Sequence, residues 1–428
     1  MTGRLAVALL PLLLLATAAA GPRLLPALVA APNADGVAVT LSAGGGLTLD
    51  HPFFKSLGAS GRACATCHVP AEGWSLVPSE VQRRFDTSAG LDPLFRPHDA
   101  AVSPRADVTT LQARRRAYAL LLTRGLIRVG LPIPAHAEFE LEAVDDPYGF
   151  ASAGELSLFR RPLPATNLKF LTTVMWDGRE SDAGRALVSD LLAQAAGAAS
   201  AHAQAAALDD EARRAIINLE RVLFTAQSQD RRVGALDAER AAGGPRSLAD
   251  QPFQFAINSF MDQTGTPPTR RVFTLFDAWA GSPDETRRAI ASGQALFNEH
   301  ALGSRRVTCS GCHNAPNAGS NSTGAFFDGV SGGADGALPL YSLRCVKGPM
   351  TGQTLRTTDP GWGLVTGRCM DVGKFKVPTL RGLAGRPPYF HNGSAATLED
   401  VVGSYDRRFA IGLSPAETHD LVAFLRAL

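Results

Sequence analysis

The sequence has almost no excess of charge of either sign. Its 42 lysine and arginine residues are balanced by 40 aspartate and glutamate residues, which gives a formal net charge of +2. The absence of a strongly charged surface argues against nucleic acid or an acidic membrane as a partner. Aromatic residues are also few, at 7%, while the hydrophobic fraction of 45% is that of an ordinary folded protein. A chain of 428 residues is long enough for two domains.

Long apolar runs are missing after the first twenty residues. Arg4 precedes an apolar run at residues 5–15, and the alanines at 18–20 are small enough for cleavage. Residues 1–20 are therefore predicted to be a secretory signal peptide. The alternative is an uncleaved anchor, but a span needs about 20 apolar residues, and Gly21-Pro22 ends the run too early. We expect an exported protein without stable membrane insertion after signal cleavage.

Cysteine is scarce, with six residues, and four of them occur in two Cys-x-x-Cys-His motifs. Covalent heme attachment needs two thiols for the porphyrin vinyl groups and an imidazole that reaches the iron. Composition alone predicts roughly 0.002 copies of this motif per chain, so two copies are not coincidence. A zinc site would need its four ligands together, and a redox Cys-x-x-Cys would lack the paired histidines. The motifs predict two covalently attached hemes c, on Cys64, Cys67 and His68 and on Cys309, Cys312 and His313.

Two cysteines, Cys345 and Cys369, remain outside the heme motifs. In an oxidising compartment, a disulfide between them would close a long loop. The alternative is a pair of buried free thiols.

The chain divides into segments of different composition. Residues 21–45 are rich in proline, glycine and alanine, which predicts a flexible N-terminal tail. An N-terminal domain is expected at 46–265, a linker at 266–281 and a C-terminal domain at 282–428. Within the first domain, apolar residues at helical spacing predict a helix over residues 209–227. No strand alternation is convincing, so the predicted fold is mainly α, with long loops and a helical insertion.

The C-terminal domain is predicted to begin and end with capped helices. Ser282-Pro-Asp-Glu and Ser414-Pro-Ala-Glu both have the pattern of capping boxes with proline at the first helical position. Gly293, ahead of the second heme motif, would let the two helices cross closely. Residues 314–373 are rich in glycine, asparagine and serine and are predicted to be loop. This arrangement is typical of a class I cytochrome c domain.

Two further motifs resemble the bacterial diheme cytochrome c peroxidase family, which includes the MauG-type enzymes. One is Val-Met-Trp-Asp-Gly-Arg at residues 174–179. The other is Phe-Lys-Val-Pro-Thr-Leu-Arg at 375–381, followed by Pro-Tyr-Phe-His-Asn-Gly-Ser at 388–394 and Ala-Thr-Leu-Glu at 396–399. The resemblance covers most of residues 46–428 and implies two class I cytochrome c-like domains in the periplasm.

The resemblance also implies roles for single residues. His68 and His313 would be the proximal iron ligands; the N-terminal heme would react with hydrogen peroxide, and the C-terminal heme would receive or store electrons. Trp176 would relay electrons between the hemes, although simple core packing is the alternative. Tyr405 falls where electron-accepting peroxidases have methionine and MauG-type enzymes have tyrosine. Phenolate ligation favours ferric and higher states, so a His/Tyr heme could store an oxidising equivalent. Met350 or Met370 is the alternative ligand.

The distal side of the first heme departs from the family pattern. The expected Asn-Pro-x-Glu-Met segment is missing, and Gln194 and His202 stand after the Trp-Asp-Gly-Arg element instead. His202 could move the peroxide proton, because histidine titrates near neutrality; an exposed histidine on an alanine-rich helix is the alternative. His98 and His136 are further candidates to cap the iron in a resting state.

Three basic residues complete the predicted site. Lys376 and Arg381 are expected to contact heme propionates, with solvated surface charge as the alternative. Arg386 stands where the family places a threonine ligand of an interdomain calcium, and a guanidinium beside calcium is unfavourable, so calcium is doubtful.

Together these features favour a periplasmic diheme peroxidase or MauG-like oxidoreductase that uses hydrogen peroxide. Its electrons would come from a small redox protein or from a residue of a partner protein. The alternatives are a diheme electron-transfer cytochrome without an open iron site, and an oxygenase that acts on an organic substrate.

Overall fold

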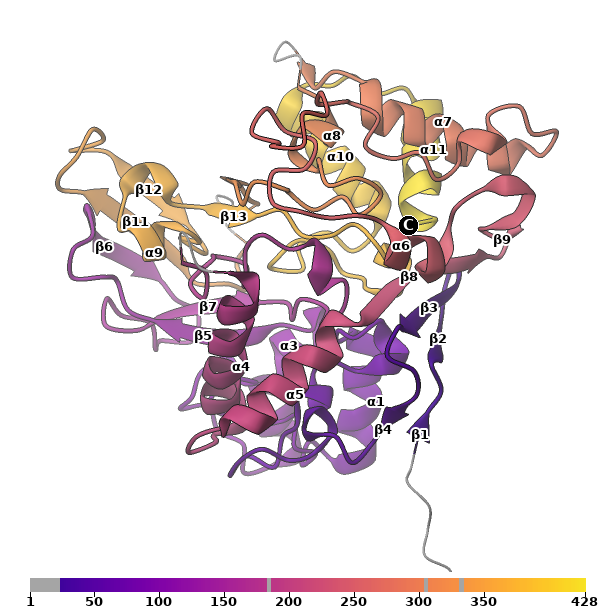
Figure 1. The fold of residues 1–428 in the computed structure, drawn as a ribbon. Coiled ribbons are helices and arrows are strands. Elements are labelled where there is room, and N and C mark those ends of the chain that lie inside the picture. The colour runs from indigo at the N-terminus through magenta and orange to yellow at the C-terminus, as the bar shows by residue number, and fades with distance from the viewer. Residues whose placement is uncertain (1–23, 183–185, 304–306, 331–334) are drawn as a thin grey trace, which may run out of the picture.

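The computed structural model describes residues 24–182, 186–303, 307–330 and 335–428. The predicted signal peptide at residues 1–20 lies outside these residues. Elements from the first half of the chain form the lower body in Figure 1, and α7, α10 and α11 of the C-terminal part lie together above it. Within the described residues, no helix combines the length and the apolar character that a membrane span requires.

Most of residues 24–42 form strands, which corrects the prediction of a flexible tail over residues 21–45. Side chains of β3 alternate between two faces: Ala38 and Thr40 lie on the buried face, and Val37, Val39 and Leu41 lie on the partly exposed face. The four-stranded sheet has the order β2-β3-β8-β9, and β3 pairs antiparallel with β8. The strands are β1 (Leu24–Leu25), β2 (Leu28–Asn33), β3 (Gly36–Ser42), β4 (Leu47–Thr48), β8 (Leu223–Asp230) and β9 (Gly234–Ala235).

The helix predicted over residues 209–227 is shorter than expected. Asp209 caps α5 by accepting a hydrogen bond from the Ala212 amide, and the helix ends at Arg221. Leu223, which continues the helical spacing, instead begins strand β8 because β3 supplies it with backbone partners. The helices of this part are α1 (Pro78–Ser88), α2 (Leu111–Ala117), α3 (Ala119–Arg124), α4 (Leu187–Ala203), α5 (Asp210–Arg221) and α6 (Gly244–Asp250).

The predicted helix crossing in the C-terminal part is confirmed. A Cβ on Gly293 would lie 1.9 Å from the carbonyl oxygen of Asp420, so only glycine allows this approach of α7 and α11. Ser414 and Glu417 form the expected capping box, but α7 is capped by Asp284 rather than Ser282. The helices are α7 (Glu285–Glu299), α8 (Cys309–Cys312), α10 (Leu398–Phe409) and α11 (Pro415–Arg426).

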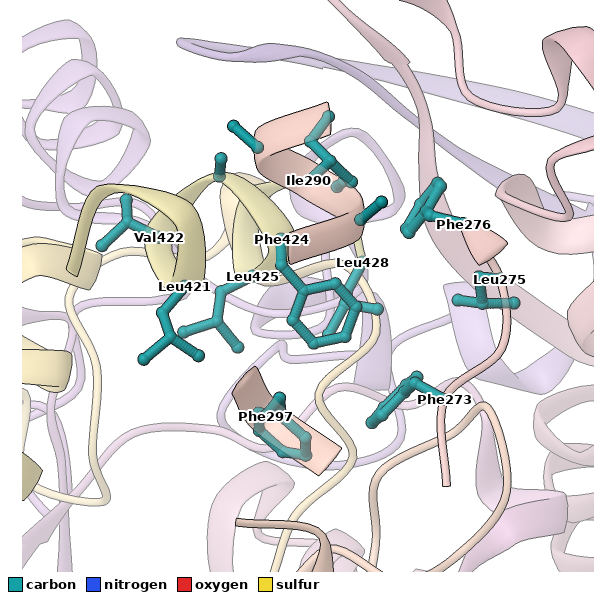
Figure 2. Close-up of a cluster of buried hydrophobic side chains, with 14 of the residues drawn as sticks. Phe273, Leu275, Phe276, Ile290, Phe297, Leu421, Val422, Phe424, Leu425 and Leu428 are labelled. Carbon is teal, nitrogen blue, oxygen red and sulfur yellow. The ribbon is translucent and has the colours of Figure 1, made fainter. Parts of the chain in front are cut away.

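The proposed linker at 266–281 is in large part core, which corrects its assignment. Phe273, Phe276 and Trp279 are fully buried and belong to the apolar cluster of α7 and α11. Figure 2 shows Phe273 and Phe276 beside Phe424 of α11. The segment therefore contributes buried aromatic residues to the C-terminal core, although residues 266–271 and several positions after them are exposed.

The segment at 314–373 is not only loop, and the fold is mixed rather than mainly α. Strand β6 of the first predicted domain pairs with β11 of the second, so one sheet joins both parts. Cys345, the last residue of β11, forms a disulfide with Cys369. The remaining elements are β5 (Ile127–Leu131), β6 (Phe139–Asp145), β7 (Leu156–Arg160), β10 (Phe326–Asp328), β11 (Leu340–Cys345), β12 (Thr354–Thr357), α9 (Gly363–Thr366) and β13 (Lys374–Lys376).

Candidate functional site

The first Cys-x-x-Cys-His motif lies on a short 3₁₀ turn, Cys64–Thr66. Nδ1 of His68 is 3.2 Å from the carbonyl oxygen of Trp74. Burial lowers the pKa of His68 to about 4, although this hydrogen bond opposes the shift. Trp74 is itself fixed, because its Nε1 donates to Thr40 of β3 at 2.9 Å. A strand from the segment expected to be a tail therefore supports the imidazole and leaves its Nε2 for another partner.

A cavity of about 200 Å³ opens beside this imidazole and is lined mostly by apolar side chains. It brings together several of the predicted residues: Cys64, Cys67, His68, Trp176, Gln194, His202 and Lys376. His98 and His136, the other candidates for capping the iron, are not among its lining residues. Gln194 and His202 both come from α4, the alanine-rich helix.

His202 is held by a buried carboxylate that sequence reasoning did not identify. Its Nδ1 is 2.8 Å from Oδ2 of Asp99, and Nη1 of Arg62 donates to the same oxygen at 2.6 Å. Burial alone would raise the pKa of Asp99, but the bonds from His202 and His98 and the charge of Arg62 hold it well below its usual range. The aspartate is therefore a carboxylate at neutral pH.

Glu220 is a second cavity residue that the sequence did not reveal. It lies on α5, and its Oε2 is buried without a hydrogen-bond partner. Burial raises the pKa of Glu220 to about 8. The available signal was a glutamate next to the apolar residues Ile216, Ile217 and Leu219 of the helix, but a solvated face would give the same pattern.

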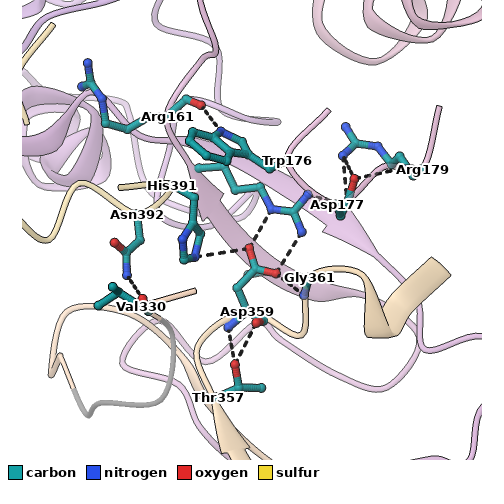
Figure 3. Close-up of polar contacts among 12 residues, drawn as sticks. Arg161, Trp176, Asp177, Arg179, Val330, Thr357, Asp359, Gly361, His391 and Asn392 are labelled. Atoms are coloured by element: carbon teal, nitrogen blue, oxygen red, sulfur yellow. Dashed lines mark hydrogen bonds and ion pairs between the residues drawn. The ribbon is translucent and has the colours of Figure 1, made fainter. Parts of the chain in front are cut away.

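Trp176 lies between the cavity and the C-terminal part of the chain. Its Nε1 donates to the carbonyl oxygen of Arg161 at 2.8 Å, and its ring is 6.2 Å from that of His391 (Figure 3). The ring of His391 stacks on Phe375 at 4.0 Å. Burial lowers the pKa of His391 to about 4, so this imidazole is neutral at physiological pH.

A buried arginine fixes the segment that carries Trp176. Arg160 of β7 donates to Asp177 at 2.5 Å and to Asp359 at 2.6 Å (Figure 3 shows both aspartates). Burial alone would lower the pKa of Arg160, but the two carboxylates raise it above the usual value. Because Asp359 belongs to the C-terminal half, this triad joins the two parts of the molecule; sequence spacing gave no signal for it.

The second Cys-x-x-Cys-His motif forms α8 and presents His313 in the same way as His68. Nδ1 of His313 is 2.5 Å from the carbonyl oxygen of Gly319, and burial lowers its pKa to about 4. Tyr405 lies on α10, 39% exposed, between Phe390 and Phe409. Packing and the nearby thiols of the motif raise the pKa of Tyr405 to about 12.

The alternative methionine ligands belong to another part of the molecule. Met350 packs on the cluster around the disulfide, and Met370 is exposed with its sulfur against Arg368.

Lys376 and Arg381 are buried basic side chains, not surface charges. Nζ of Lys376 donates to the carbonyl oxygen of Thr173 at 3.0 Å, and burial lowers its pKa to about 7 although Asp177 opposes the shift. Arg381 donates to two carbonyl oxygens, but its Nε has no partner. Burial lowers the pKa of Arg381 to about 9. Both side chains could therefore take an anionic partner.

The residues of both motifs fit a covalently attached heme. The four motif cysteines are free thiols. Burial raises the pKa values of Cys64 and Cys309 to about 12, which argues against a redox-active thiolate pair. Each motif histidine uses Nδ1 on a backbone carbonyl, which leaves Nε2 for iron. At the first motif, both thiols and the imidazole line one largely apolar cavity.

The guanidinium of Arg386 bonds to backbone carbonyl oxygens at the place where the family resemblance would put a calcium ion. Nη2 donates to the carbonyl oxygen of Arg381 at 2.8 Å, and Nε donates to that of Gly382 at 3.1 Å. Carbonyl oxygens of this kind are ligands that calcium would need. Among the described residues, no group of three His, Cys, Asp or Glu side chains is arranged to hold a metal ion.

Comparisons with known proteins find relatives that are named cytochrome-c peroxidases. No protein-family model matches the chain. The chain is 34% identical over 173 residues to "Cytochrome-c peroxidase IdrP1" of Denitromonas iodatirespirans, a match that covers 36% of this chain and 44% of that protein. It is 29% identical over 175 residues to "Cytochrome c551 peroxidase" of Nitrosomonas europaea, covering 40% and 42%. The matches thus span less than half the length of these relatives.

Among solved structures, the chain is similar to a MauG-like protein associated with microbial copper homeostasis. The TM-score is 0.36 and the identity 18%, over 65% of this chain and 75% of that one.

Proposed function

We propose that the chain is a periplasmic oxidoreductase of the bacterial diheme cytochrome c peroxidase and MauG-type family and that it reduces hydrogen peroxide. Its similarity to proteins named cytochrome-c peroxidase supports this proposal. Two hemes c would be attached through the two Cys-x-x-Cys-His motifs. The observation that carries the proposal is the first cavity, where His68, His202 and Trp176 come together beside two free thiols. A c-type heme bound there would supply an iron that can accept peroxide oxygen and exchange electrons.

The protein side chains would bind and orient the two groups. His68 and His313 would present Nε2 as proximal ligands, since their Nδ1 atoms are held by carbonyl oxygens. Lys376 and Arg381 would pair with propionates, because both are buried without a carboxylate partner at hydrogen-bond distance. Tyr405 would be the distal ligand at the second motif, which its nearness to both thiols of that motif supports.

The cavity residues would handle protons and electrons. His202 would accept and return the peroxide proton, with Gln194 as a neighbouring hydrogen-bonding group on the same helix. Trp176 would pass electrons between the two sites, since it lines the cavity and contacts His391 of the C-terminal part. Its Nε1 proton is held by a backbone carbonyl, which does not accept it permanently, so we expect electron transfer through Trp176 without proton loss.

The electron donor is proposed as a small redox protein or a residue on a partner protein. The experiment that tests the function measures peroxide consumption by the purified protein with a reduced small c-type cytochrome as donor. The expected result is peroxide-dependent oxidation of the donor, which falls to background when Cys64 and Cys67 are both replaced by alanine. Donor exchange that continues without any peroxide consumption would instead identify an electron-transfer cytochrome.

A further inference from the structure

His202 is fixed in place from two sides. It lies in the last turn of α4, where Arg62 donates to its carbonyl oxygen at 3.1 Å. The hydroxyl of Ser60 donates to the next carbonyl, that of Ala203, at 2.9 Å. A Cβ on Gly58 would lie 2.5 Å from the same oxygen, so the loop before the first heme motif packs tightly on this end of the helix.

The carboxylate that holds the imidazole is equally constrained. Asp99 is 4% exposed. Its Oδ2 accepts a hydrogen bond from Nη1 of Arg62 at 2.6 Å and lies 2.8 Å from Nδ1 of His202. The other guanidinium nitrogens of Arg62 donate to the carbonyl oxygens of Pro93 and Leu94, at 2.9 and 2.6 Å. His98 approaches the same carboxylate with its Nε2 at 3.4 Å but does not line the cavity.

This geometry selects one form of the imidazole. A carboxylate can only accept, so Nδ1 of His202 must carry a proton, and the lone pair of the neutral ring then resides on Nε2. His202 lines the cavity, and Nε2 is the ring nitrogen that remains for a bound molecule. A carboxylate that orients an imidazole and stabilises its protonated form is a recurring arrangement for proton transfer.

We propose that Asp99 is a positioning residue that makes His202 the proton acceptor of the cavity beside His68. The inference rests on the proposed peroxide reaction and deepens it. Nε2 of His202 would take a proton from one peroxide oxygen and give it to the other as the O–O bond breaks, so that this other oxygen leaves as water. A c-type heme held by His68 would supply the two electrons for this reduction and the acceptor for the remaining oxygen. The imidazole ends each cycle as it began, so no net proton is consumed by the pair.

Cyanide binding to the ferric holoprotein tests this proton step without turnover. Hydrogen cyanide must lose its proton when it binds ferric iron, and the association rate therefore reports a nearby base. His202→Gln should slow association about 100-fold or more, within the range that a positioned acid–base group contributes. Asp99→Asn should slow it at least about tenfold, because an amide can present the wrong partner to Nδ1.

A double-variant cycle separates positioning from a purely structural role. If Asp99 acts through His202, then Asp99→Asn in the His202→Gln background should change the rate less than about twofold. His98→Gln is the matched control, because it removes the other imidazole from the same carboxylate and leaves the cavity pair; its effect should stay below about fivefold. Equal slowing by Asp99→Asn in both backgrounds would overturn the positioning role.

Two outcomes would reject the inference directly. Faster cyanide binding in His202→Gln would mean that His202 blocks the iron, and unchanged binding would mean that it is no base.

Should Asp99→Asn fail to fold, ¹⁵N-histidine NMR of the reduced, CO-bound wild-type protein decides: the expected tautomer carries its proton on Nδ1, and a proton on Nε2 contradicts the proposal. If the wild type reacts with peroxide and these variants do so equally well, the inference fails and the proposed function stands; no reaction in the wild type rejects the function itself.

Discussion

The crossing of α7 and α11 provides a quantitative test of the C-terminal packing. In the Gly293→Ala variant, the added Cβ would lie 1.9 Å from the carbonyl oxygen of Asp420 and 2.8 Å from Cβ of Phe424. Ordinary carbon contacts need about 3.5 Å, so the helices would have to separate by about 1.5 Å. The nearest atoms are backbone, and they cannot move aside as the end of a flexible side chain can.

The expected cost follows from two opposing effects. Overpacking a tight core costs about 1–3 kcal/mol, and the helix propensity of alanine returns up to about 1 kcal/mol. Because the clash involves backbone between two helices that carry the main C-terminal cluster, we expect a net loss of about 2 kcal/mol in the free energy of unfolding. For a domain of this size, that corresponds to a midpoint lower by roughly 4–8 °C.

The assay is thermal unfolding of the holoprotein, followed by circular dichroism at 222 nm. Gly281→Ala is the matched control, because nothing lies within 4 Å of a Cβ at that position, and its midpoint should change by less than about 2 °C. A Gly293→Ala protein as stable as the wild type would refute the packing argument.

Four further changes have defined outcomes. Tyr405→Phe should keep both hemes attached but remove the spectral change that peroxide causes at the second heme; an undiminished change in absorption would exclude Tyr405 as a ligand. Glu220 ionises at about 4.5 when unfolded and about 8 when folded, so it lowers stability as the pH rises between these values; Glu220→Gln should lose less stability than the wild type from pH 4.5 to 8 in urea titrations, by at most about 5 kcal/mol, and parallel curves would contradict this. Replacing Cys345 and Cys369 by serine should cost about 3 kcal/mol in the same titration, because the disulfide closes a loop with a sequence separation of 24; no loss would refute it. The thermal midpoint should be insensitive to EDTA and to added calcium, since the Arg386 guanidinium bonds the local carbonyl oxygens; a calcium-dependent rise would show a site.

Features that depend on nearby residues were predictable from the sequence. The Ser414 capping box and the two Cys-x-x-Cys-His motifs are contained in a few consecutive residues, and all three occur where expected. Gly293 was predictable because a glycine within the apolar face of a helix leaves room for a second helix to approach. The start of α7 was misplaced by two residues because Ser282 and Asp284 are both good caps, and only the folded geometry selects Asp284.

Features that depend on distant partners were not predictable. Residues 28–42 form strands because β8, far along the chain, supplies the hydrogen bonds of β3. The same pairing ends the helix before Leu223, although the spacing of apolar residues continues through it. Sheet β12-β11-β6 likewise joins segments from both predicted domains. The tendency of such segments to form strands depends on cross-strand neighbours, which the sequence alone does not reveal.

The candidate site also contains residues that the sequence predicts and residues that only the fold reveals. Gln194, His202 and Trp176 can be named from the sequence, and the fold brings all three to one cavity. Asp99 lies far from His202 in sequence, in a segment without a motif, and its role depends on the packing of one loop on the end of α4. The buried Arg160 also gave no signal, since a charged residue in a sequence usually indicates solvated surface.

The central claim is that the first motif carries a heme that peroxide can reach. It is tested most directly by the absorption spectrum of the ferric holoprotein before and after one equivalent of hydrogen peroxide. The account predicts a high-spin ferric component, assigned to the heme on His68, that is lost when peroxide is added. Two low-spin, six-coordinate hemes whose spectrum does not change with peroxide would contradict it.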